Sequence, residues 1–248
     1  MMIDSNLTFL QYCTNEDLRS LCDILTHNHK GEVRLSEQLT YSDCYKRCYP
    51  DNMQEMWSEI AEELQKFGGN TFANMLRGGT GASYESILHD VCKKMKVNLP
   101  SPVCVEEAEQ LLLMKYCEKA IGMMDLNLLR ELSAEIGVEP KNYNQQMLAA
   151  TILIALRYGG GKLLGLVVYY IGANIGRILA GRGLYFAVGG ILGRAFGIFT
   201  GPLGWAITAG WLALDIASPA YRVTIPAVLM VACLRTKFNS HILTAHCS

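Results

Sequence analysis

Residues 53–69, MQEMWSEIAEELQKFGG, decide the fold class of this 248-residue chain. Their apolar side chains recur at the three- and four-residue spacing of a helix face, at Met53, Met56, Trp57, Ile60, Leu64 and Phe67. Four acidic residues are expected on the opposite, solvent-facing side: Glu55, Glu59, Glu62 and Glu63. Gly68 and Gly69 are expected to end the helix, because glycine readily adopts the left-handed conformation found at helix ends. The stretch predicts an amphipathic helix that packs by one face.

The same helical pattern recurs through residues 1–147. Thr14 and Asp17 have the spacing of a capping box, and an apolar stripe from Leu18 to Leu25 follows them. Further helices are predicted over Tyr84–Met95, Val105–Ile121 and Leu126–Ile136. The alternation typical of strands is nearly absent. We expect an all-α protein, in which an N-terminal helical bundle is followed by a Gly-rich apolar helical hairpin segment.

The net charge of −1 conceals a division of the chain into two unlike regions. Residues 1–147 have a net charge of −8, whereas residues 148–248 contain one acid, Asp215, and have a net charge of +7. The second region also holds 15 of the 23 glycines. We predict an acidic soluble helical domain over 1–147, with a short N-terminal domain over about 1–50, and a basic, apolar, membrane-active region over 148–248. This distribution argues against a nucleic-acid-binding protein with a general basic face.

The first residues and the cysteines indicate the compartment. Met1–Asn6 contains neither a basic segment nor a long apolar one, so no secretory signal is expected. Nine cysteines are an odd number for a disulfide framework, and reduced thiols that serve as small core residues are the favoured interpretation. We expect a cytoplasmic protein with peripheral or integral association with the inner membrane.

The basic region contains three uncharged stretches, over Leu163–Gly176, Gly183–Gly193 and Ala195–Leu214. The last has 20 residues, and a helix of that length spans about 30 Å, roughly one hydrocarbon core. Four basic residues are predicted to contact anionic lipid at the membrane surface: Lys162, Arg177, Arg182 and Arg194. A segment that transfers between water and an anionic membrane is therefore expected.

Glycines at helical spacing give a second signal in this region. A face for contact with a membrane or with a second copy is predicted from Gly172, Gly176, Gly189, Gly193, Gly197, Gly201, Trp205 and Trp211. Glycine allows neighbouring helix backbones to approach closely, as in membrane helix pairs. The alternative is a glycine-rich hairpin buried within a soluble bundle.

Three places in the sequence contain residue types that could carry chemistry. A possible anion-binding loop precedes a helix N-terminus and contains Arg77, Gly78, Gly79 and Gly81, although a helix cap and turn is the favoured reading. His27 and His29 with Cys44 and Cys48 offer four metal ligands without the paired spacing usual for structural zinc. His89 and Cys92 lack an evident partner for nucleophilic catalysis. We therefore expect no catalytic residue, no metal and no cofactor.

The tail contains a recognisable string, Pro219–Val228 followed by Ala232–Arg235, whose marked residues are Tyr221, Arg222, Pro226 and Arg235. It resembles the C-terminal signature of the uncharacterised bacterial YaaW-like family. Leu7–Asn28 resembles the short N-terminal domain of that family. The family's middle signature is similar to Phe67–Asn74, Leu76–Gly78 and Ile87–Val91. The family is grouped with ubiquinol–cytochrome c chaperone-like proteins, so the resemblance implies a helical protein without catalytic residues to carry over. On physical grounds, Pro226 is expected to break any helix that begins near Tyr221.

Together these observations favour a non-enzymatic, amphitropic helical protein that inserts into an anionic membrane or forms a homo-oligomer through its glycine face. The alternatives are a chaperone-like assembly factor and a soluble adaptor with a protein partner. An enzyme with a metal or phosphate site is less favoured, and no nucleic-acid partner is expected.

Overall fold

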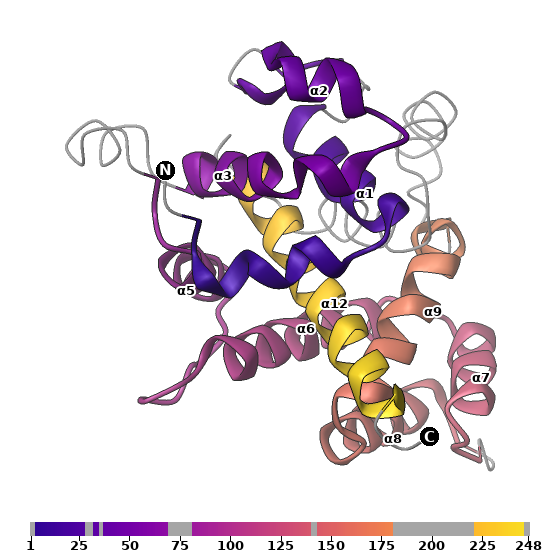
Figure 1. Ribbon diagram of the computed structural model, residues 1–248. Coiled ribbons are helices and arrows are strands. Elements are labelled where there is room, and N and C mark those ends of the chain that lie inside the picture. The colour runs from indigo at the N-terminus through magenta and orange to yellow at the C-terminus, as the bar shows by residue number, and fades with distance from the viewer. Residues whose placement is uncertain are drawn as a thin grey trace.

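A computed structural model describes residues 3–27, 32–34, 37–68, 81–139, 143–180 and 221–245. Regular secondary structure in these residues is helical, apart from a single isolated antiparallel bridge between His27 and Val33. The prediction of an all-α fold is confirmed. Short helices pack around one long helix that crosses the middle of the molecule (Figure 1).

The described elements follow one another along the chain as α-helices and short 3-10 helices. They are η1 (Ser5–Tyr12), α1 (Asn15–Thr26), η2 (Leu39–Tyr41), α2 (Asp43–Cys48), η3 (Met53–Met56), α3 (Trp57–Gly68), α5 (Tyr84–Lys94), α6 (Val105–Ile121), α7 (Leu126–Glu135), α8 (Gln145–Tyr158), α9 (Gly160–Ala180) and α12 (Tyr221–Ala245).

Local sequence signals place the N-terminal helices well. The Thr14 hydroxyl accepts a hydrogen bond from the Asp17 amide at 3.2 Å, and Asp17 accepts one from the Thr14 amide, so the predicted capping box is present. The stripe from Leu18 to Leu25 is fully buried. Helix α6 has the predicted bounds, and α7 ends one residue before the predicted position.

One predicted surface residue of α3 is in the core. Glu63 is 2% exposed, although the periodic pattern placed it on the solvent-facing side. Its carboxylate accepts a hydrogen bond from the Gln38 amide at 3.1 Å and lies 3.7 Å from the Lys66 ammonium. The prediction was wrong because the backbone just before η2 covers this side of α3. Its Gln38 amide, 25 residues away in sequence, is the polar partner of the Glu63 carboxylate.

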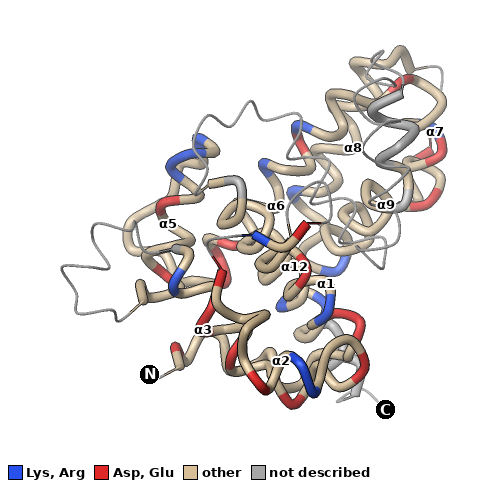
Figure 2. Tube along the Cα trace, turned by 90° about the horizontal axis from the view of Figure 1, so that it is seen from above, with Lys and Arg blue, Asp and Glu red and all other residues tan. Residues whose placement is uncertain are grey.

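Helix α12 is the centre of the molecule. Every residue from 223 to 235 is buried, and the helix packs against α1, α3, α5, α6, α9 and η1. Figure 2 shows the same arrangement from above, with α12 among α1, α3 and α6. A helix that is apolar on all sides requires such complete enclosure.

Pro226 does not break this helix, contrary to expectation. Helix α12 begins at Tyr221 and continues through Pro226 to Ala245. Pro226 is the sixth residue of the helix, so it removes the hydrogen bond to the carbonyl of Arg222 and its ring crowds that carbonyl. Burial of the following apolar turns outweighs that loss.

Two glycines mark the boundary between helices α8 and α9 of the basic region. Helix α8 ends at Tyr158 with Gly159 as its C-cap, and Gly160 begins α9 with a φ of +68°, which favours glycine. Helix α9 buries Leu164, Val167, Val168 and Ile171 against α6 and α12. The described helices on both sides of residue 147 thus share one hydrophobic core.

The cysteines behave as core residues. Six of the eight described cysteines are buried, and all eight are free thiols. Only Cys104 is exposed among them. The prediction that cysteines serve as small apolar side chains holds for these six positions.

None of the described helices combines the length and the apolar character needed to cross a bilayer. Part of the predicted membrane-active region lies outside the described residues. This part includes the 20-residue run over 195–214, the glycines of the predicted face from Gly189 to Gly201, and Trp205, Trp211, Arg182 and Arg194.

Candidate functional site

A buried ion pair joins α12 to α6. The Arg235 Nε donates to Glu109 Oε2 at 2.6 Å, and its Nη2 donates to the carbonyl oxygen of Asn6 at 2.6 Å. The guanidinium also lies over the ring of Phe9, 4.3 Å from the centroid. Arg235 is 8% exposed and Glu109 is 2% exposed. Arg235, one of the four marked residues of the tail string, is thus bonded to groups more than 100 residues away in sequence.

The network continues into α5. The Tyr84 hydroxyl donates to Glu109 Oε1 at 2.6 Å, so each oxygen of this carboxylate has a partner. The Tyr84 amide, at the N-terminus of α5, donates to Asp4 Oδ2 at 2.7 Å. The positive end of the helix, three residues after Gly81 in the sequence, therefore receives a carboxylate from the protein itself.

Burial governs the protonation of these groups. It raises the pKa of Glu109, and the positive charge and hydrogen bond of Arg235 oppose that change. Burial beside the Glu109 carboxylate also raises the pKa of Tyr84 well above its ordinary value, so its hydroxyl remains a donor. Because both oxygens of Glu109 have partners, this network anchors α12 to α5 and α6.

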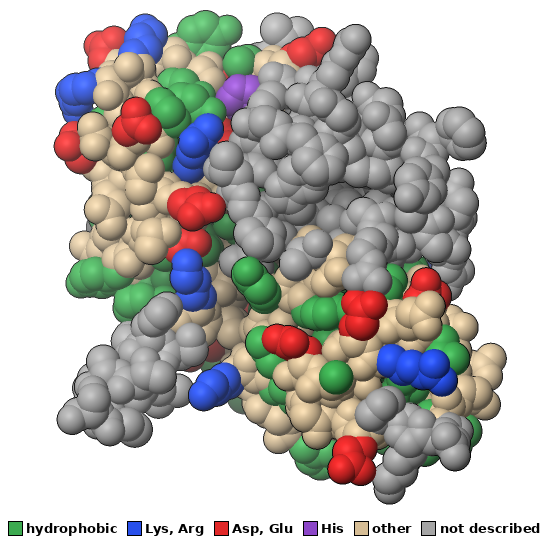
Figure 3. Space-filling model, turned by 90° about the vertical axis from the view of Figure 1, so that its right-hand side faces the viewer, with side chains coloured by type: hydrophobic (Ala, Val, Ile, Leu, Met, Phe, Trp, Pro, Cys, Tyr) green, Lys and Arg blue, Asp and Glu red, His purple; other side chains and the backbone are tan. Residues whose placement is uncertain are grey.

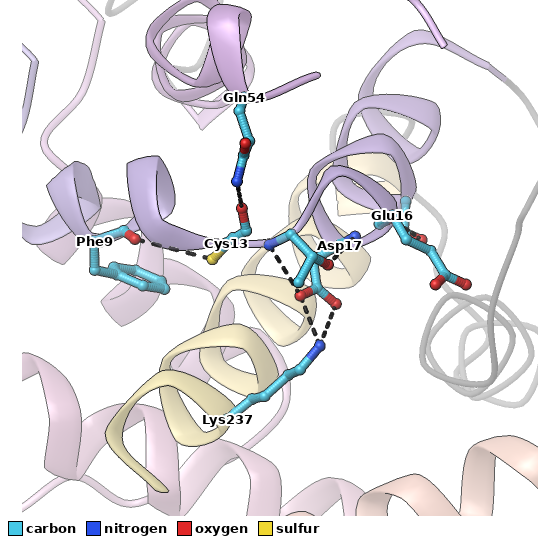
Figure 4. A network of polar contacts seen from close by, with 8 residues as sticks. Phe9, Cys13, Glu16, Asp17, Gln54 and Lys237 are labelled. Atoms are coloured by element: carbon cyan, nitrogen blue, oxygen red, sulfur yellow. Dashed lines mark hydrogen bonds and ion pairs between the residues drawn. The ribbon is translucent and has the colours of Figure 1, made fainter. Parts of the chain in front are cut away.

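A second ion pair ties α12 to α1. Lys237 donates to both carboxylate oxygens of Asp17, at 2.9 and 2.7 Å (Figure 4). Nearby, the Gln54 amide donates to the carbonyl of Cys13 at 3.0 Å. Asp17 has two roles, because the same side chain completes the capping box of α1. These contacts join the basic and acidic regions of the chain.

A separate polar cluster surrounds Asp23 on α1. This side chain is fully buried; Tyr49 donates to its Oδ1 at 3.1 Å, and its Oδ2 has no hydrogen-bond partner. Burial raises its pKa to about 7, against the hydrogen bond from Tyr49 and the charge of Arg19. Asp23 is therefore partly protonated at neutral pH, an unusual state for a carboxyl group.

His27 is neutral beside this carboxyl group. Burial lowers the pKa of His27, so its 3.9 Å contact with Asp23 is not a strong ion pair at neutral pH. The Thr26 hydroxyl donates its single proton to the Cys22 carbonyl at 2.8 Å. The 2.8 Å contact between Thr26 and His27 therefore requires the proton on His27 Nδ1.

Exposed apolar side chains are concentrated on α8 and α9. Of the eight large apolar side chains that are exposed in the described residues, five lie on these two helices: Met147, Ile154, Tyr158, Leu166 and Tyr169. Hydrophobic side chains also reach the surface in the lower part of Figure 3, where α7 and α8 lie. We call the five side chains, together with the exposed cations Arg157 and Lys162, the α8–α9 face.

The predicted site residues are distributed over several surroundings. Gly81 is packed so closely that an added Cβ would lie 2.8 Å from the backbone of Gln65, which indicates a packing role. Gly172 is buried within α9, and Lys162 is exposed. Tyr221 is partly buried and Pro226 is buried. Nothing is described of Arg77, Gly78 and Gly79, or of the side-chain surroundings of Arg177, Arg222 and Gly176.

In the part of the chain that the structure describes, the possible metal ligands are not gathered at one point, and His89 does not pair with Cys92. In the described residues, no three or more His, Cys, Asp or Glu side chains already surround a point that would hold a metal ion. The ring of His27 is in hydrogen-bond contact with Thr26. Cys44 and Cys48 lie next to each other on α2, and His29 is outside the described residues. His89 is exposed and Cys92 is buried against the Ala108 carbonyl, so they do not form a pair. Sequence reasoning missed Glu109 and Asp23, because each occupies a helix position with no local sign of burial.

The fold and the buried network define a helical-bundle protein built around an internal, arginine-anchored C-terminal helix. Residues 1–35 match a domain of unknown function, DUF3944. A UPF0174 protein of Helicobacter pylori is 40% identical over 235 residues, covering 94% of this chain and 92% of the relative. The UPF0174 protein YaaW of Escherichia coli is 34% identical over 94% of each chain.

The chain therefore belongs to the UPF0174 family, which confirms the YaaW-like resemblance. No solved structure matches it.

Proposed function

We propose that this protein associates with anionic membrane surfaces through the α8–α9 face and has no enzymatic activity. The observation that carries the proposal is the exposure of Tyr158, which is 88% accessible at the junction of α8 and α9. Arg157 and Lys162 are exposed on either side of it. An aromatic ring flanked by cations suits the boundary between lipid headgroups and acyl chains.

Helical spacing makes this face continuous along each helix. Met147, Ile154 and Tyr158 recur at intervals of seven and four residues along α8, and Lys162, Leu166 and Tyr169 recur at intervals of four and three residues along α9. Both helices bury their opposite sides in the core. The exposed side can therefore contact a surface while the bundle remains folded.

Charge supports an anionic partner. Residues 145–180 contain three basic residues and no acidic residue. Each cation near an anionic leaflet contributes about 1 kcal/mol of attraction. An acid-free apolar face is thus suited to a lipid surface rather than to the polar surface of an average protein.

Helix α12 sets a limit on this mode of association. Its residues 223–235 are enclosed by the other helices, and Arg235 and Lys237 bind acidic partners within the bundle. Moving α12 to a membrane would expose the core and separate both ion pairs. We therefore propose attachment of the folded bundle, with insertion or oligomerisation through Gly189–Gly201 as an additional prediction for the segment outside the described residues.

Cosedimentation with lipid vesicles tests the proposal. The full chain is mixed with phosphatidylcholine vesicles that contain or lack phosphatidylglycerol, and the bound fraction is measured at several salt concentrations. Arg157→Gln with Lys162→Gln should lower the partition coefficient about 30-fold, since two cations contribute about 2 kcal/mol. Ile154→Ser with Tyr158→Ser should also weaken binding, because it removes the apolar contact.

The matched control is Tyr41→Ser. Tyr41 is 69% exposed but lies on η2 in the acidic region, so this change should leave vesicle binding unaltered. Equal binding to both kinds of vesicle, or unchanged binding by the charge variant, would contradict the proposal. Self-association that the Ile154 and Tyr158 changes abolish, without any vesicle binding, would identify the face as a contact between copies and overturn a membrane role.

A further inference from the structure

Helix α2 presents two thiols on one side. Ser42 caps the helix by accepting a hydrogen bond from the Tyr45 amide at 3.0 Å, and the following turn places Cys44 and Cys48 four residues apart. Their Sγ atoms are 3.8 Å apart. Cys48 is buried and Cys44 is partly exposed, so the pair is accessible from the Cys44 side.

Carboxylates from the next elements approach the two thiols. Glu55 of η3 places Oε2 3.7 Å from the Cys48 Sγ. Glu59 of α3 is a further neighbour of the Cys44 thiol. Thiolates and carboxylates are both ligands of divalent metal ions such as zinc.

The separations suit a tetrahedral metal ion. Two thiolates that bind zinc at about 2.3 Å lie about 3.8 Å apart when the coordination angle is tetrahedral. A thiolate and a carboxylate oxygen on the same ion lie about 3.6 Å apart. The observed Sγ–Sγ distance of 3.8 Å and Sγ–Oε2 distance of 3.7 Å are close to these values.

We propose that Cys44 and Cys48 bind a thiophilic divalent cation, with Zn²⁺ as the expected ion, and that Glu55 and water complete its coordination. On binding, both thiols lose their protons to solvent and two sulfur–metal bonds form, with no change of oxidation state. The thiols are in position before binding, whereas the third ligand must move toward the ion, because no three such groups yet surround one point in the described residues. Arg47, whose Nη2 lies 4.0 Å from the Cys44 Sγ, is exposed and can turn away.

The consequence would be a link between α2 and η3. These elements are in contact at the top of the molecule in Figure 1, away from α8 and α9. The proposed ion site is therefore independent of the membrane-binding face, and each proposal can fail without the other.

Titration of the metal-free full chain with Zn²⁺ in competition with a chromophoric chelator tests the site. One ion should bind per chain with release of the two thiol protons, measured in weakly buffered solution. Cd²⁺ should give the ultraviolet charge-transfer band of a bis-thiolate complex. Cys44→Ser should abolish that band, and Glu55→Gln should weaken Zn²⁺ binding about 10- to 100-fold, as loss of a supporting ligand group does in metal sites.

The matched control is Cys104→Ser, which removes an exposed thiol elsewhere and should leave binding unchanged. Circular dichroism of each variant shows whether the helical fold is kept, and the exposed position of Glu55 makes its variant informative even if Cys48→Ser unfolds the protein. Absence of Zn²⁺ binding by the unaltered chain would overturn the proposal. Binding that survives Cys44→Ser with an unchanged Cd²⁺ band would also refute it, because other thiols would then be the ligands.

Discussion

Replacing Arg235 with methionine should destabilise the protein severely. The change removes the 2.6 Å bond to Glu109, the 2.6 Å bond to the Asn6 carbonyl and the contact with the Phe9 ring. Glu109, 2% exposed, would keep a buried carboxylate without its cation. Breaking a buried ion pair in this way costs about 3–5 kcal/mol, a large part of the typical 5–15 kcal/mol stability of a domain.

Urea unfolding followed by far-ultraviolet circular dichroism measures this loss. With a urea slope of about 2 kcal/mol per molar, a cost of 4 kcal/mol lowers the midpoint by about 2 M. Glu109→Gln removes the charge that Arg235 neutralises. In a protein that carries Glu109→Gln, the Arg235→Met change should therefore lower the free energy of unfolding by at least about 1.5 kcal/mol less than it does in the unaltered protein. Arg47→Met, on the surface of α2, serves as the control and should shift stability by no more than about 0.5 kcal/mol. A loss below about 1 kcal/mol, or an equal loss in both backgrounds, would refute the reasoning.

Three other changes test separate features of the fold. Because the pKa of Asp23 rises from 3.8 to about 7 on folding, its protonation stabilises the folded state at acidic pH, and this stabilisation is lost as the pH rises toward 7. Asp23→Asn should therefore gain stability over the unaltered protein across that window, by at most about 4 kcal/mol, and a difference in urea midpoint that does not vary with pH would argue against it. Gly81→Ala should lower the free energy of unfolding in urea by about 1–3 kcal/mol, because the added Cβ would lie 2.8 Å from the Gln65 backbone. Gly161→Ala is the control: the atom nearest to its added Cβ is 3.9 Å away, so this change should not destabilise the protein. Thr14→Ala should cost about 1 kcal/mol, measured by thermal unfolding, through loss of the α1 cap, and an unchanged transition would show that the cap contributes nothing.

The helices themselves were predictable because their signals are local. Apolar spacing and the capping box fix α1 from residues within one or two turns, and the same holds for α6 and α7. The charge division at residue 147 was equally visible. It did not reveal that helices from both regions share one core, because packing depends on contacts between distant segments.

The residues that sequence reasoning placed wrongly have distant partners. Glu63 has the spacing of a surface residue, and its burial depends on an amide 25 positions away. Pro226 is a poor helix residue by local propensity, yet the enclosure of α12 on all sides outweighs that preference. Glu109 and Arg235 are 126 positions apart, so no spacing rule could pair them, even though the tail string marked Arg235.

The central position of α12 has a consequence for biosynthesis. A ribosome makes α12 after all the helices that enclose it, so α1, α3, α5, α6 and α9 emerge with their shared interior unfilled. Long-range contacts of this kind slow folding and leave apolar surface exposed until they form. The nascent chain therefore remains dependent on protection from aggregation until α12 leaves the exit tunnel, and termination before α12 yields fragments with an incomplete core rather than smaller working proteins.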